Sequence, residues 1–203
     1  MDRRTVLLNG AVLAAGLALP AFAARREPVL GGPCEGCEWV FDDLPAKLAS
    51  RARIAPAGEP GDPMVLEGTV VTPRGDPAAG VIVYAYHTDR IGIYPPARNR
   101  HGRLRGWAVS DQDGRYRFDS IRPAAYPGRQ VPEHVHMHVI EPGVGTYYID
   151  NLLFEDDELL SPTDRDAPGR GGKGLAAPLR RQGAWWVRRD ITLGRNIPGY
   201  PSD

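Results

Sequence analysis

The chain has 203 residues and a formal net charge of zero at pH 7, because 25 basic side chains balance 25 acidic ones. This length is enough for one domain with its own hydrophobic core. The charge balance excludes an electrostatic case for nucleic acid or an anionic membrane surface as a partner. With 24 glycines and 20 prolines, the composition indicates many turns and few long helices. We therefore expect an all-β protein.

The first 23 residues have the features of an export signal. Arg3 and Arg4 precede an apolar run at residues 6–19, and a small-x-small pattern ends at Ala23, where signal peptidase would cleave. The paired arginines are typical of a twin-arginine signal. An uncleaved membrane anchor is the alternative, but the run is shorter than the roughly 20 residues that a spanning helix needs. We expect an exported, periplasmic or extracellular protein with no stable membrane span after cleavage.

Residues 24–63 are predicted to form an N-terminal arm that lies on the domain, because prolines and glycines interrupt them repeatedly. One helical turn is expected after Asp43. Cys34 and Cys37 form a C-x-x-C motif, for which a local disulfide is expected in an oxidising compartment. A metal clip would need two further ligands. A thioredoxin-like redox site would need a strand and helix context that the following residues lack.

Residues 64–203 are predicted to be a β-sandwich domain. Segment 146–154 is apolar and fits either a strand or a short buried helix, because periodicity alone does not separate the two. About seven strands without alternating helices favour an antiparallel or mixed sandwich with few short helices over a doubly wound sheet. The expected strands are 64–71, 81–87, 106–110, 115–121, one starting at residue 134, 146–154 (if a strand) and 184–193, with a surface loop at 162–174.

Three histidines alternate along the strand that is expected to begin at His134. Side chains on a strand repeat with a period of two, so His134, His136 and His138 lie on one face, with about 6–7 Å between neighbours. Imidazole is the commonest protein metal ligand. This face is therefore a candidate metal site. His87 and His101, which lack such a pattern, are expected to be ordinary surface residues.

The order of motifs resembles the catalytic domain of the intradiol ring-cleavage dioxygenases, the protocatechuate and catechol group. The resemblance covers roughly residues 64–193 and consists of an ordered set of strand aromatics, turn glycines and candidate ligands. The matching motifs are Val81-Ile82-Val83-Tyr84, Tyr94, Ser110-Asp111-x-x-Gly114-x-Tyr116-x-Phe118, Tyr126-Pro127-Gly128-Arg129 and His134-x-His136.

This resemblance implies a non-haem ferric ion held by two tyrosinates and two histidines, which correspond to Tyr94, Tyr126, His134 and His136. Phenolate is a hard anionic ligand that suits a trivalent ion. The implied reaction cleaves a catechol-type aromatic ring between its two hydroxyl-bearing carbons with O2 and gives a muconate-type diacid. Tyr126 is implied to leave the ion and take up a substrate proton, which makes it catalytic as well as a ligand.

Arg129 is the candidate for a second catalytic role. The family places an arginine three residues before the first histidine to stabilise charge on the bound ring, but Val131 occupies that position here. We expect the loop to bulge so that Arg129 reaches the metal face; the alternative is a solvated turn residue. The role of His138 is open between a hydrogen bonder, a substrate contact and an extra ligand.

Two other functional classes compete with a dioxygenase. Transthyretin-like sandwiches share much of the strand and turn pattern and serve as non-catalytic binding modules. A copper or zinc protein could instead use His134, His136 and His138 without a tyrosinate. The expected partners of the dioxygenase are a catechol-type small molecule and O2. A homo-oligomer is compatible with the sequence, which contains no obvious helical dimerisation segment.

Overall fold

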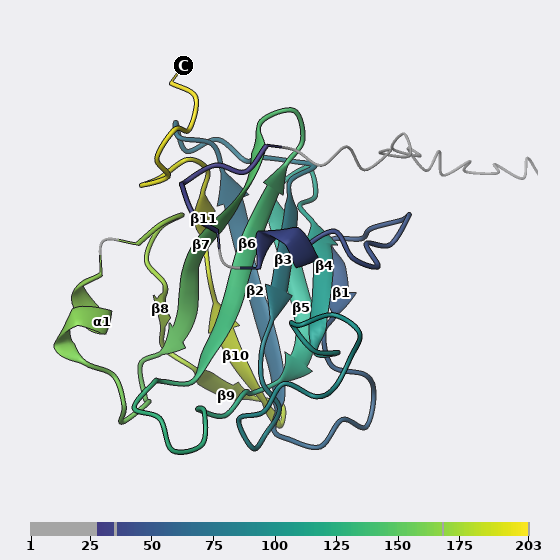
Figure 1. Ribbon diagram of the computed structural model, residues 1–203, viewed down its shortest axis with the longest axis vertical. Helices are drawn as coiled ribbons and strands as arrows, with labels where there is room; N and C mark the ends of the chain where they lie inside the picture. Colours follow the sequence, from purple (N-terminus) through teal and green to yellow (C-terminus); the bar gives the residue numbers. More distant parts are fainter. Residues whose placement is uncertain (1–27, 35, 168, 203) are drawn as a thin grey trace, which may run out of the picture.

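The computed structural model describes residues 28–34, 36–167 and 169–202, and Figure 1 shows their strands stacked in layers. The export signal predicted for residues 1–23 lies outside the described residues. Within the described ranges, no helix combines the length and the apolar character needed to cross a membrane.

Two mixed β-sheets make up the described body. The first has the strand order β4-β3-β6-β7-β8, and the second has the order β1-β5-β2-β10-β9, with β11 also paired to β2. This arrangement confirms the predicted all-β sandwich. The strands are β1 (Arg51–Arg53), β2 (Pro63–Val71), β3 (Ile82–Tyr86), β4 (Arg105–Val109), β5 (Arg115–Ile121), β6 (His134–Glu141), β7 (Gly145–Phe154), β8 (Leu175–Ala176), β9 (Leu179–Arg181), β10 (Ala184–Arg188) and β11 (Ile191–Thr192).

The main core contains alternate residues of both sheets. Val83 of β3 and Val135 and Met137 of β6 belong to the same buried cluster as Leu66 of β2 and Phe118 of β5, and all five are fully buried. Burying one such side chain stabilises the fold by roughly 1.5–3 kcal/mol. Because strand side chains alternate between faces, the intervening residues of β3 and β6 point to the opposite, outer face of the first sheet.

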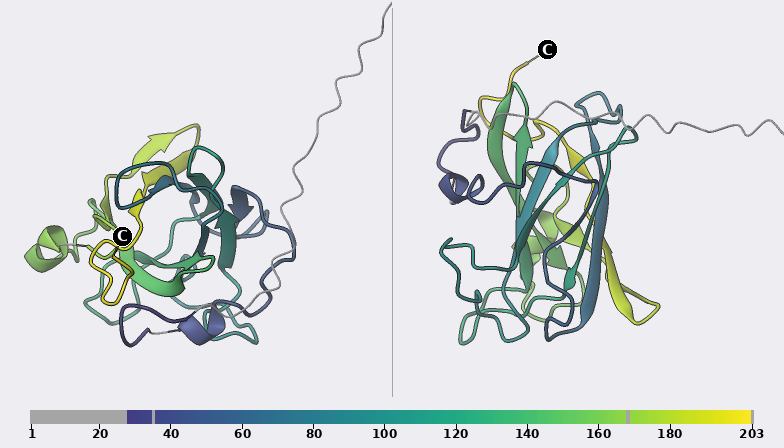
Figure 2. Two further views of the ribbon diagram at one scale, coloured as in Figure 1. Left: turned by 90° about the horizontal axis from the view of Figure 1, so that it is seen from above. Right: turned by 90° about the vertical axis from the view of Figure 1, so that its right-hand side faces the viewer.

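The N-terminal arm covers part of this outer face. Val40 is fully buried against Tyr84 and Tyr86, and the Trp107 indole donates a 2.8 Å hydrogen bond to the Val40 carbonyl. Figure 2 shows the arm on the outside of the strands. The helical turn expected after Asp43 is wrong: the arm has a 3₁₀ turn at Cys37–Trp39 instead, and Asp43 adopts φ 61°, which a right-handed helix does not tolerate.

The apolar segment 146–154 is a strand, and an irregularity explains why its pattern was ambiguous. Tyr147 and Ile149 point into the main core, and so do Leu152 and Phe154, so the inward positions shift by one residue. The register between β6 and β7 changes at this point, between Val135 and Met137. A bulge adds one residue to a strand and re-aims its neighbours, which keeps all four apolar side chains inside.

The predicted arm also differs from expectation by containing β1, which pairs with β5. Two further differences from the expected elements have local causes. The predicted loop 162–174 contains the short helix α1 (Pro162–Asp166), which Ser161 caps by accepting a hydrogen bond from the Asp164 backbone. The predicted strand 184–193 is divided into β10 and β11. Asp190 lies at the break, where its carboxylate accepts the Thr69 backbone hydrogen bond at 2.8 Å and so replaces a strand carbonyl.

Candidate metal centre and ligand cavity

The candidate site lies on the outer face of the first sheet, at the beginning of β6. His134 and His136 point outward there while Val135 between them points into the main core. Tyr86 of β3 is directly opposite His136 in the register. Tyr94 and Tyr126 belong to two loops that border the same cavity as the histidines. The alternating pattern therefore orients the histidines, and the loops bring two phenols to them.

Four side-chain atoms converge at this point. The Tyr126 hydroxyl lies 2.6 Å from the Tyr94 hydroxyl, 3.2 Å from Nε2 of His134 and 3.3 Å from Nε2 of His136. The two Nε2 atoms are 3.1 Å apart. Ligands bound at about 2.1 Å to one ion, at right angles to each other, lie about 3 Å apart. The spacing and the chemistry of these two oxygens and two nitrogens therefore fit a single hard or borderline cation.

Both imidazoles are held in the neutral form that binds a metal. His134 donates a 2.7 Å hydrogen bond from Nδ1 to the Pro132 carbonyl, which leaves the Nε2 lone pair facing the centre. Burial lowers the pKa of His134. Burial, followed by repulsion from His134 and two further histidines, lowers the pKa of His136 to about 2, and the Asn151 side chain opposes this shift by hydrogen bonding to the ring. Metal binding therefore does not compete with a proton at neutral pH.

An aromatic stack supports His136 from behind. The Tyr86 ring is stacked on His136 at 4.5 Å between centroids and on His101 at 3.8 Å. His101 in turn shares a 2.8 Å hydrogen bond with the Tyr84 hydroxyl. The expectation that His87 and His101 are surface residues is wrong, because their exposed fractions are 0% and 4%. Both have hydrogen-bond partners, and this satisfies their polar atoms inside the protein.

His138 is not one of the converging groups. Its ring is fully buried and packs against Tyr84 and Tyr148 from the neighbouring strands, at centroid distances of 5.8 and 5.3 Å. The metal hypothesis that uses three histidines of one strand would need this ring at the centre. The structure instead brings two tyrosines to His134 and His136.

Arg129 lies in the turn that follows Tyr126. Its backbone N–H donates to the Tyr126 carbonyl at 3.2 Å, and its guanidinium carbon stands 5.7 Å from the centre of the Tyr126 ring. The residue is exposed and borders the cavity, as does Val131. A positively charged side chain, that of Arg129, therefore lies beside the centre, although the position three residues before His134 holds a valine. Its catalytic role stays a prediction.

A cavity of about 710 Å³ opens at the centre, and the arm supplies one of its walls. Gly36, Glu38 and Trp39 line it together with the four converging residues. The Trp39 carbonyl accepts a 3.0 Å hydrogen bond from Asn99, which ties this wall to the loop that carries Tyr94. Sequence reasoning missed Trp39 and Asn151, because no local pattern shows that residues so far from the histidines border the same cavity.

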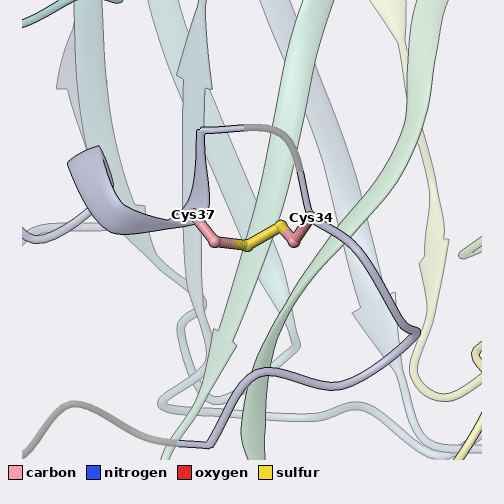
Figure 3. The surroundings of a disulfide bond; sticks show 2 residues. All are labelled: Cys34 and Cys37. Atoms are coloured by element: carbon pink, nitrogen blue, oxygen red, sulfur yellow. A yellow bond between two sulfur atoms is a disulfide. The ribbon is translucent and has the colours of Figure 1, made fainter.

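A disulfide joins Cys34 and Cys37 beside the residues that form this wall. It confirms the expected local pairing. Figure 3 shows the two side chains joined, with Cys37 as the first residue of the 3₁₀ turn. Cys37 is buried, with an exposed fraction of 5%. A short closed loop limits the conformations of the unfolded arm and favours the folded one.

Known proteins with similar sequences include dioxygenases. A protein family described as Dioxygenase matches residues 40–167. Chlorocatechol 1,2-dioxygenase from Rhodococcus opacus is 32% identical over 172 residues, which cover 73% of this chain and 63% of that protein. The protocatechuate 3,4-dioxygenase beta chain from Burkholderia cepacia is 28% identical over 51% of this chain and 50% of its own length. The chain thus spans less than two thirds of each of these relatives.

Solved structures show the same fold. Catechol 1,2-dioxygenase from Acinetobacter sp. ADP1 has a TM-score of 0.58 at 20% identity and aligns with 76% of this chain and 61% of its own. The dioxygenase domain of a carbohydrate-binding fusion protein from Streptomyces sp. SirexAA-E has a TM-score of 0.57 at 21% identity. The alignment covers 80% of this chain and 93% of that one. The β-sandwich therefore has solved counterparts with the same fold.

Proposed function

Because the chain belongs to the intradiol ring-cleavage dioxygenase family, we propose that it cleaves a catechol-type aromatic ring between the two hydroxyl-bearing carbons. The co-substrate is O2, and the product is a muconate-type diacid. The convergence of the Tyr94 oxygen and two imidazole nitrogens on the Tyr126 oxygen, each within 3.3 Å of it, supports this proposal. A non-catalytic transthyretin-like module would have no use for such a cluster.

Tyr94, Tyr126, His134 and His136 would hold the family's non-haem ferric ion. Two phenolates neutralise most of the charge of a trivalent cation, which lowers the cost of keeping it in a partly buried site. When bound, the ion supplies Lewis acidity and a template for both oxygens of the diol. The low pKa of His136 and the lowered pKa of His134 keep both rings unprotonated.

The oxygen of Tyr126 is the proposed acceptor for a substrate proton. It lies within 3.3 Å of each of the other three atoms, so it can exchange one partner for another without leaving the site. The neighbouring Tyr94 oxygen, at 2.6 Å, can accept a hydrogen bond from Tyr126 once Tyr126 carries the proton. Neither histidine competes for this proton, because burial disfavours their charged forms.

Arg129 and the arm have supporting roles in this proposal. The Arg129 guanidinium beside Tyr126 offers a positive charge where negative charge develops on the bound ring. Trp39 provides an aromatic surface on the wall of the cavity, which orients a planar substrate and excludes water. Both residues act on the substrate without binding the ion.

The proposal is tested by metal analysis, a visible spectrum and oxygen uptake with catechol. Two tyrosinates on ferric iron give a visible charge-transfer band, so we expect a coloured protein with one iron per chain. Substituting Tyr126→Phe is expected to shift the band and to lower kcat by about 100-fold or more, which is the usual size of a lost proton-transfer group. The control is Tyr200→Phe, which removes a phenol hydroxyl bound to Glu141. An iron-free, colourless protein after iron supply, or full activity in Tyr126→Phe, would contradict the proposal.

We also propose that the mature protein works outside the cytoplasm. The signal-like pattern of residues 1–23 and the Cys34–Cys37 disulfide both support an oxidising compartment. N-terminal sequencing of the protein from the exporting host tests this, with Ala24 as the expected first residue.

A further inference from the structure

A second group of metal-binding side chains lies beside the candidate centre. Sγ of Cys34, Sγ of Cys37 and one ring nitrogen of His138 all lie within 4.8 Å of one another. Cys37 and His138 are buried, and Cys34 is partly buried. His138 belongs to the central part of β6, whereas the cysteines belong to the arm that covers it. From this cluster we propose that Cys34, Cys37 and His138 bind a thiophilic divalent cation, with Zn²⁺ as the preferred ion, when the disulfide is reduced.

The local backbone has the form that a two-cysteine metal clip requires. The spacing C-x-x-C is the usual spacing of cysteine pairs in zinc sites. Gly36, just before Cys37, has φ 79°, a left-handed conformation that glycine adopts without strain. The Cys37 N–H donates to the Cys34 carbonyl at 3.5 Å, so the turn is closed by the backbone as well as by the sulfurs. Reduction of the disulfide therefore leaves both sulfurs on the same short turn.

Charge neutrality favours a divalent ion at this position. Two thiolates and one neutral imidazole around Zn²⁺ give a net charge of zero, and a neutral assembly avoids most of the cost of burying a charge. The fully buried ring of His138 is surrounded by Tyr84 and Tyr148, which fix its position before the ion arrives. Cys₂His sets with one further position open to water or another ligand are known zinc sites.

The ligand chemistry separates this site from the one proposed for iron. Tyr94, Tyr126, His134 and His136 offer oxygen and nitrogen, which suit a hard trivalent ion, whereas thiolates select soft or borderline ions. The two sites share the strand β6, since His138 is two residues after His136. They remain independent in their spectra, because only the cysteine site contains sulfur.

A dithiol can serve as the reductant that converts the disulfide into the metal site, with all electrons and protons accounted for. The dithiol breaks the Cys34–Cys37 bond, supplies two electrons and two protons, and becomes a cyclic disulfide itself. The two thiols then lose their protons to the solvent as the cation binds. In either state a covalent or coordinate link closes the loop, so the arm wall formed by Gly36 and Trp39 stays on the sheet.

The experiment titrates the iron-loaded chain with Co²⁺ alone, after reduction by a dithiol and removal of the reductant under anaerobic conditions. We expect one Co²⁺ per reduced chain with a thiolate-to-cobalt charge-transfer band, and no such band in the unreduced chain. Zn²⁺ should then abolish the band by displacing Co²⁺. Substituting His138→Gln should weaken Co²⁺ binding by about 10-fold or more, since even loss of an outer partner of a ligand costs that much. The matched control is His87→Gln, which replaces another fully buried histidine.

The alternative outcomes overturn the proposal. These are a reduced chain without the band, an equal band in the unreduced chain, and unchanged affinity in His138→Gln. If His138→Gln fails to fold, Cys37→Ser tests the cluster from the other side: it keeps His138, and persistence of a strong thiolate band at one Co²⁺ per chain would refute the site. The site is independent of the proposed ring cleavage, so its failure would show in the thiolate band and leave the visible band of iron unchanged.

Discussion

His134 and His136 present the same nitrogen to the centre, although different neighbours hold them. The Pro132 carbonyl fixes the tautomer of His134, and the Asn151 side chain bonds to His136. The residues of the centre itself were accessible from the sequence, because the motif order places Tyr94, Tyr126, His134 and His136 at matching positions of a known family. Asn151 was not accessible, because it faces His136 only through the irregular register of β7.

Trp39 is the residue whose substitution best tests the arm wall. Trp39→Ala removes an aromatic surface from the cavity without touching the four converging atoms. We expect KM for catechol to rise about 10-fold, since hydrophobic pocket contacts are worth about 1–3 kcal/mol. We expect kcat and iron content to stay near their original values, because such a contact binds substrate and transition state equally. Steady-state kinetics and metal analysis measure these quantities.

Two further variants control the Trp39 experiment. Trp39→Phe keeps a flat aromatic surface and should restore most of the affinity. Trp186→Ala removes an indole from β10 of the other sheet, where it packs with Arg117, and should leave KM unchanged. An unchanged KM in Trp39→Ala would remove this residue from the substrate wall.

At the scale of elements, a charged network anchors the segment that leads into β6. Arg122 donates to Glu133 at 2.8 Å and pairs with both oxygens of Asp156 at 2.7 and 2.8 Å. The Glu133 backbone N–H bonds to Asp157. These contacts hold Glu133, which directly follows the Pro132 carbonyl that orients His134. The position of the segment that leads into β6 therefore depends partly on charged side chains on the side of the strand opposite the histidines.

Glu133→Gln should weaken the anchoring of the segment that leads into β6. The change removes the negative charge that Arg122 binds and keeps the shape of the side chain. We expect iron to bind about 10-fold more weakly, in line with the loss of groups that position metal ligands, and the chain to remain folded. Competition with an iron chelator measures the affinity, and circular dichroism checks the fold.

The matched control is Asp119→Asn, which removes a carboxylate that Arg51 and Arg117 share on the other sheet. It should leave iron affinity unchanged. If both variants lose iron equally, the effect is one of general stability and the positioning role of Glu133 is wrong.

The element pattern also shows where sequence periodicity is informative. The strict alternation of β3 and β6 predicted which face each side chain occupies, and the buried clusters agree. In β7 the shift between Ile149 and Leu152 breaks the period of two, so the segment fitted a strand and a helix equally well. In the arm, Asp43 adopts a left-handed backbone conformation that the neighbouring sequence did not predict.

For the molecule as a whole, buried histidines predict a loss of stability in mild acid. Burial lowers the pKa of His87 to about 4, while an unfolded histidine has a pKa near 6.5. Between these values the unfolded chain binds a proton that the native chain does not, so the free energy of unfolding falls as the pH falls. The shift corresponds to about 3 kcal/mol lost between pH 6.5 and pH 4.

Urea unfolding at several pH values measures this loss. His87→Gln should show a shallower fall over the same window, and part of the slope should remain because burial also lowers the pKa of His101 to about 4. The pKa values of Asp62, Asp119 and Asp156 are also lowered. These carboxylates change the free energy of unfolding below about pH 3.8, which is outside the window between pH 4 and pH 6.5. If the free energy of unfolding falls equally with pH in the original protein and in His87→Gln, His87 is not a cause of the acid sensitivity.

The pairing of β10 with β2 has a consequence for how the chain reaches its native state. Trp185 and Met64 are partners in a parallel ladder, although they lie near opposite ends of the domain. The sheet around β2 thus stays incomplete until the ribosome has released β10, more than 100 residues after β2. Long-range pairing of this kind slows folding, so nascent chains remain in an unfinished, exposed form for longer than a helical protein of equal size.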